Sequence, residues 1–94
     1  MNKMELLTAT EANEKIVNSL EYKSLHNHMW AEVVDTINEA INRGDSNVTY
    51  DSGTNTQLGI RIVNRIEDKL RNSGYIVHRG FQGKSELVIS WNNL

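Results

Sequence analysis

Cysteine and proline are both absent from this 94-residue chain, and aromatic residues make up only 6% of it. Without cysteine the chain can form neither a disulfide framework nor a thiolate metal site, which fits a reducing cytosol. Without proline every turn depends on Gly, Asn, Asp and Ser. No apolar run approaches the roughly 20 residues of a membrane span, and the N-terminus lacks the apolar stretch of a signal peptide. We therefore expect a cytoplasmic protein with no membrane partner.

A strong excess of charge of either sign is also lacking, because ten Lys and Arg residues stand against 12 Asp and Glu, a net charge of −2. A charged fraction of 23% and a hydrophobic fraction of 38% are typical of a soluble folded protein. The length predicts one small domain over residues 1–94. Because a chain of this size buries a small share of its surface, we also expect a homo-oligomer.

What the chain does contain is a repeated unit of amphipathic helix, glycine and short strand. Residues 37–44 run into a strand at 48–50, and residues 66–74 run into a strand at 75–78. Gly44 and Gly74 suit the left-handed conformation that closes a helix, since glycine has no Cβ to clash there.

Two further signals predict where helices begin. Thr8 and Glu11 have the spacing of a capping box, and a first helix of about three turns should follow. The apolar stripe then shifts around the axis, so we expect a break within 21–27, with Ser24 as the N-cap of the second helix. Thr54 and Gln57 predict the start of a third helix.

The predicted fold is therefore α+β, in the order α-α-β-α-β-β, with a small three-stranded sheet packed against two to three helices. Alternating apolar residues over 87–91 predict the last strand, which forms a hairpin with the preceding one. A winged helix is disfavoured because it needs two helices between its first two strands. Residues 54–73 have room for only one.

Basic side chains recur every four residues along one flank of the third helix, and two more lie near the hairpin turn. Cations at this spacing repel one another unless an anion lies between them, so an anion- or phosphate-binding site is one interpretation. The alternative is that Glu67 and Asp68 neutralise them. The candidate ligand-binding residues are Arg61, Arg65, Lys69, Arg79 and Lys84.

Metal binding and catalysis have weaker support. His28, Glu32, Asp35 and Glu39 share one helix face, but a solvated face has the same composition. His26 lies on the apolar side of its helix. No phosphate loop or catalytic triad spacing occurs, so we predict no metal site, no cofactor and no enzymatic activity. Large aromatic residues make a self-association surface the better candidate, and these are Trp30, Phe81 and Trp91.

Residues 33–91 resemble a recurrent class of short accessory proteins of tailed bacteriophages. The shared pattern is a helix with Ala-Ile and then Gly, a strand, a helix, Gly-Tyr-x-Val and a closing Ile-x-Trp. Here it comprises Ala40, Ile41, Gly44, Val48, Gly74, Tyr75, Val77, Ile89 and Trp91. The resemblance implies an accessory protein that acts in the host cytoplasm or is carried in the virion.

Together these observations predict a small, non-enzymatic binding protein of bacteriophage type. It would form an oligomer that engages a host protein or an anionic, phosphate-bearing small molecule. The alternatives are a nucleic-acid-binding module that uses the basic helix flank and a minor structural protein of the virion.

Overall fold

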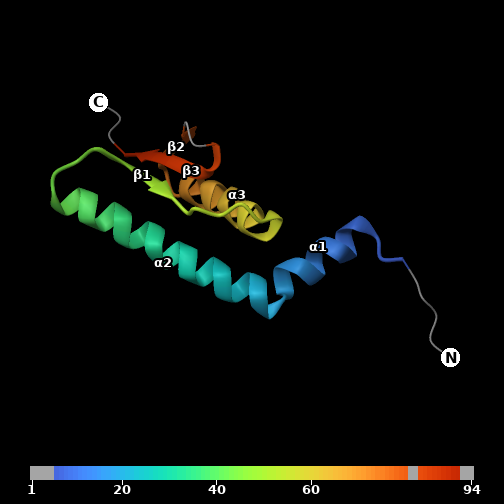
Figure 1. Ribbon diagram of the computed structural model, residues 1–94. Helices are drawn as coiled ribbons and strands as arrows, with labels where there is room; N and C mark the ends of the chain where they lie inside the picture. Colours follow the sequence, from blue (N-terminus) through green and yellow to red (C-terminus); the bar gives the residue numbers. More distant parts are fainter. Residues whose placement is uncertain (1–5, 81–82, 92–94) are drawn as a thin grey trace.

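Three helices and a three-stranded sheet make up the fold in the computed structural model, which describes residues 6–80 and 83–91 (Figure 1). The elements are α1 (Ala9–Asn18), α2 (Leu20–Asn42), β1 (Asn47–Asp51), α3 (Gln57–Asn72), β2 (Ile76–Gly80) and β3 (Gly83–Ser90). The predicted α+β class and the order α-α-β-α-β-β are confirmed.

The sheet has the order β1-β3-β2, and β3 is antiparallel to both of its neighbours. Strands β1 and β2 are therefore parallel to each other, with β3 between them. The predicted hairpin of the last two strands is confirmed by the pairing of Val77 with Ile89. On the other side of β3, Leu87 pairs with Tyr50.

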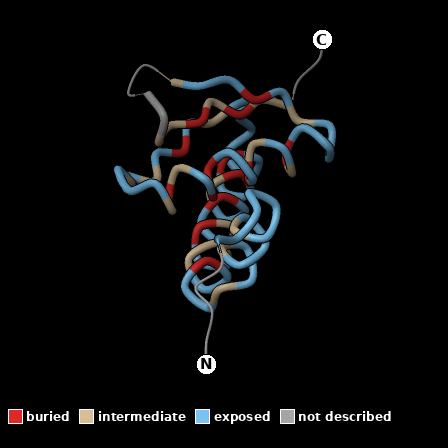
Figure 2. The backbone as a smooth tube through the Cα atoms, turned by 90° about the vertical axis from the view of Figure 1, so that its right-hand side faces the viewer, coloured by how far each residue is buried: buried red, intermediate tan, exposed pale blue. Residues whose placement is uncertain are grey.

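The core lies where α2 and α3 pack against the sheet (Figure 2). Core members that are 0% exposed come from α2, α3 and β3, and they include Val33, Ile62, Ile66, Leu87 and Ile89. Helix α1 contributes no buried residue and extends away from the rest of the fold (Figure 1). A ten-residue helix is marginal by itself in water, so its capping box is one of its few local sources of stability.

The break between α1 and α2 lies at Ser19, and its predicted position within 21–27 was wrong. Ser19 has an extended backbone with ψ of 148°, and it is both the C-cap of α1 and the N-cap of α2. Its hydroxyl donates to the Ile16 carbonyl at 2.8 Å and accepts from the Tyr22 amide at 3.1 Å. Because Ser19 satisfies groups on both helices, the chain breaks there, and Ser24 lies inside α2.

The other helix ends are closer to expectation. The Thr8–Glu11 capping box is confirmed by both of its hydrogen bonds. Thr56 rather than Thr54 caps α3, because the Thr56 hydroxyl accepts from the Gly59 amide at 3.0 Å. The two glycines that close helices have positive φ angles, 84° at Gly44 and 96° at Gly74.

Candidate anion-binding groove

Helix α3 separates the basic residues that the sequence groups together. Arg65 and Lys69 lie on the flank of α3 that faces α2, whereas Arg79 of β2 contacts Asn64 and Glu67. On a helix, positions 64 and 67 point away from positions 65 and 69. The structure therefore does not bring Arg79 into one site with the others, and the Lys84 side chain lies outside the described residues.

Arg79 has a structural partner that accounts for its position. The carboxylate of Glu67 is only 12% exposed and contacts Arg79 at 2.8 Å and Arg71 at 2.6 Å. Arg71 also donates to the Val77 carbonyl at 2.8 Å. This cluster ties α3 to β2. The i,i+4 spacing of Glu67 and Arg71 was the only sequence signal for it, and the role of Arg71 was missed.

A groove between α2 and α3, open at the end of α1, gathers four basic side chains. It has a volume of about 300 Å³. The residues that line it include no carboxylate, and they are Val17, Asn18, Tyr22, Lys23, His26, Arg65 and Lys69. We call this the basic groove. Arg61, at the next turn of the same α3 flank, is held instead by α1, since it donates to the Asn13 side chain at 3.0 Å.

Aromatic rings position two of the groove side chains. The Lys69 ammonium lies 4.1 Å from the centre of the Trp30 ring, within the range of a cation–π interaction. His26 stacks on Tyr22, with ring centres 5.9 Å apart and planes 16° apart. Both contacts hold side chains that would otherwise be mobile, so a ligand would order fewer rotamers on binding.

The protonation of His26 reflects its surroundings. Partial burial lowers the pKa of His26, and the positive charges of Lys69 and Arg65 lower it further. His26 therefore resists taking up a proton. An anion would reverse this effect, because a negative charge beside the ring stabilises the imidazolium form.

We expect a bound anion to raise the pKa of His26 and, by linkage, affinity to increase as the pH falls through the pKa of His26 in the bound state. Sulfate is the suitable probe because it does not titrate in this range. NMR titration of the His26 ring protons with and without sulfate would measure both pKa values. An unchanged His26 pKa at saturating sulfate would contradict a site in the groove, and a His26→Gln variant should lose the pH dependence of sulfate affinity.

Lys23 and His26 were not among the predicted ligand-binding residues. They are three residues apart on α2 and lie one turn from each other, but nothing in the sequence places them opposite Arg65 and Lys69. Only the packing of α2 on α3 creates the basic groove.

One residue on the acidic face of α2, Glu32, makes contacts within the fold. Glu32 accepts a hydrogen bond from the Tyr50 hydroxyl at 2.9 Å and lies 3.6 Å from His28. Burial, followed by this bond to Glu32, raises the pKa of Tyr50. Within residues 6–80 and 83–91, no group of three His, Asp or Glu side chains is placed to hold a metal ion.

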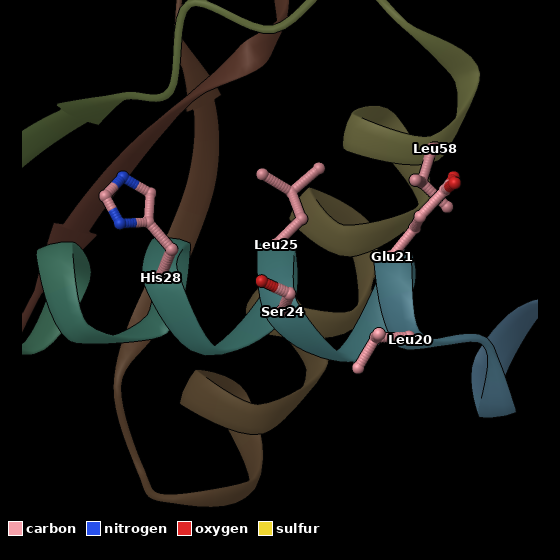
Figure 3. Close-up of a pocket in the computed structure, with 6 residues that line it drawn as sticks. All are labelled: Leu20, Glu21, Ser24, Leu25, His28 and Leu58. Carbon is pink, nitrogen blue, oxygen red and sulfur yellow. The ribbon is translucent and has the colours of Figure 1, made fainter.

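A larger hollow of about 630 Å³ lies where the start of α2 meets the first turn of α3 (Figure 3). Leu20, Leu25 and Leu58 give it an apolar lining, to which Glu21 adds a carboxylate and His28 an imidazole. Among the described residues that line it there is no Lys or Arg, so it is a poorer candidate for an anion than the basic groove.

Two of the three aromatic residues that the sequence suggested for a self-association surface make contacts within the chain. Trp91 contacts Tyr75 edge to face, with ring centres 6.3 Å apart. Trp30 and Tyr75 line a neighbouring hollow of about 310 Å³, and both tryptophans are partly buried against the core. Phe81 lies outside the described residues. An interface that includes Trp30 and Trp91 stays a prediction.

Comparison of the chain with protein-family models gives no match, and neither do comparisons with curated proteins and with solved structures. Across the helices of the described residues, none combines the length and apolarity that crossing a bilayer requires. The basic groove is therefore the feature of the molecule that bears most directly on function.

Proposed function

We propose that this chain is a non-enzymatic binding protein that takes up a small phosphate-bearing ligand in the basic groove. The observation that carries the proposal is the convergence of Lys23, His26, Arg65 and Lys69 from two helices on one hollow without a carboxylate in its lining. A phosphate group accepts charge-assisted hydrogen bonds from such donors and relieves their mutual repulsion.

The size of the groove supports a small ligand over a nucleic-acid duplex. Its volume of about 300 Å³ is at the lower end of small-molecule sites. A duplex would need a longer positive surface, because affinity for DNA comes from many phosphate contacts. Here Arg79 is paired with Glu67, Arg61 is bonded to Asn13, and the chain has a net charge of −2.

Titration of the ¹⁵N-labelled protein with inorganic pyrophosphate tests this proposal. We expect saturable shifts confined to the amides around Lys23, His26, Arg65 and Lys69, with chloride at the same ionic strength causing none. A 20-base-pair duplex and a single strand of the same length serve as the comparison. Binding of the duplex with a steep salt dependence, in the absence of a pyrophosphate response, would favour the nucleic-acid alternative and contradict the small-ligand proposal.

The resemblance to bacteriophage accessory proteins is compatible with this function and stays a prediction. A protein that takes up a phosphate-bearing metabolite would act in the host cytoplasm, whereas a structural role would place it in the particle. Detection of the protein in purified virions by mass spectrometry, at a fixed number of copies per particle, would support the structural alternative.

A further inference from the structure

Helix α2 has an exposed, mainly apolar stripe that its own core does not use. Leu20, Asn27, Val34 and Ile41 follow one another at intervals of seven residues over the length of the helix, and Ala31 lies between them. All five are exposed, with Leu20 at 82%, Val34 at 36% and Ile41 at 47%. We call these residues the α2 stripe. Leu20 also lines the hollow near the start of α2, although its side chain projects from a different side of the helix from Leu25 and His28 (Figure 3).

The spacing of the α2 stripe indicates what covers it. A seven-residue repeat keeps side chains along one line only when two helices wrap around each other, so it is the pattern of a helix paired along its length with another. A different face of α2 packs into the core of the chain, and it includes Met29, Val33 and Ile37. An Asn within such a repeat favours a single register, because it pairs best with its own counterpart.

The charges beside the α2 stripe favour a second copy in parallel orientation. One edge of the stripe carries the acidic residues Glu21 and Asp35, and the other carries Lys23, with Arg65 and Lys69 beyond it on α3. A two-fold axis along the helices places the acidic edge of each copy against the basic edge of the other. An antiparallel pair would instead place acidic against acidic and basic against basic, which costs electrostatic energy.

We propose that α2 pairs with α2 of a second copy along this stripe, in parallel and in register, to form a homodimer. Asn27 of each copy then lies across the two-fold axis from Asn27 of the other. None of the stripe residues lines the basic groove, although Lys23, Arg65 and Lys69, whose charges favour the parallel orientation, do. The pairing is therefore tested in the absence of phosphate.

Cysteine cross-linking tests the arrangement directly, because the natural chain has no cysteine. Mild oxidation of an Asn27→Cys variant should convert most of the protein to a disulfide-linked dimer. The matched control is His28→Cys, one residue further along and on the acidic side, which should stay largely uncross-linked. Equal cross-linking of both variants, or none in Asn27→Cys, would overturn the parallel pairing.

Sedimentation equilibrium gives the independent measurement. The wild-type chain should approach twice its 10.7 kDa mass at high micromolar concentration, and Val34→Lys should sediment as a monomer, at least tenfold weaker in self-association. Circular dichroism confirms that the variant is folded. If it is not, Ile41→Lys, at a more exposed position, takes its place. A wild-type protein that stays monomeric, or folded lysine variants that dimerise as the wild type does, would overturn the proposal.

Discussion

The double variant Arg65→Gln, Lys69→Gln should lose about a hundredfold or more in pyrophosphate affinity, as measured by isothermal titration calorimetry. Each side chain is expected to supply one charge-assisted hydrogen bond, worth about 1.5–3 kcal/mol. Since about 1.4 kcal/mol corresponds to a factor of ten, two such losses reach at least a hundredfold. Glutamine keeps hydrogen-bonding capacity and much of the side-chain length, so the change removes mainly charge.

The control is a second double variant that also removes two positive charges, but outside the basic groove. Lys15 on α1 and Arg43, which is paired with Asp45 at 3.1 Å after α2, both lie outside the basic groove. We expect Lys15→Gln, Arg43→Gln to alter pyrophosphate affinity less than threefold at 0.15 M salt, because neither side chain lines the groove and salt screens exposed charges over a length of roughly 8 Å. Equal losses in the two double variants would show that net charge rather than the groove governs binding, which would contradict the proposed site.

The second large effect concerns stability. Ile66→Ala should lower the free energy of unfolding by about 2–5 kcal/mol, measured by urea denaturation followed by circular dichroism. Ile66 is 0% exposed and lies on α3 among core residues of α2, α3 and the sheet, so its removal both forfeits burial and leaves a cavity. A small domain has only about 5–15 kcal/mol in total. The variant is therefore expected to be close to the limit of folding.

Ile76→Ala makes the matched comparison, because the same atoms are removed from a side chain that is 40% exposed. We expect it to cost about 1 kcal/mol or less, mainly through the lower strand preference of alanine. Similar losses in the two variants would mean that Ile66 does not lie in a closely packed core and would contradict the packing of α3 described above.

Much of the fold could be predicted because its signals are local. The Thr8–Glu11 capping box, the closing glycines at positions 44 and 74 and the single helix between β1 and β2 all involve residues a few positions apart. The errors are local as well. Ser19 competes with Ser24 as a cap, and Thr56 competes with Thr54. Neighbouring hydroxyls of this kind are equally suitable caps in the sequence. The packed helices decide which of them accepts a hydrogen bond from a backbone amide.

The candidate site was predicted only in part. Arg65 and Lys69 could be found because both lie on one helix at i,i+4 spacing. Arg79 was included wrongly in the same group, since the pairing of β2 with β3 brings it to Glu67 on the other side of α3. Lys23 and His26 were missed because they belong to another helix, more than 35 residues away from Arg65 along the chain.

The sequence by itself determined the number, order and class of the elements, since periodicity, capping and glycine placement act within one or two turns of chain. Only the tertiary structure decided which charges meet. Coulomb interactions and hydrogen bonds depend on distances in space, and these follow from which faces of α2, α3 and β2 bury their apolar residues together. The same burial neutralises Arg79, leaves the basic groove without a carboxylate and leaves the α2 stripe exposed.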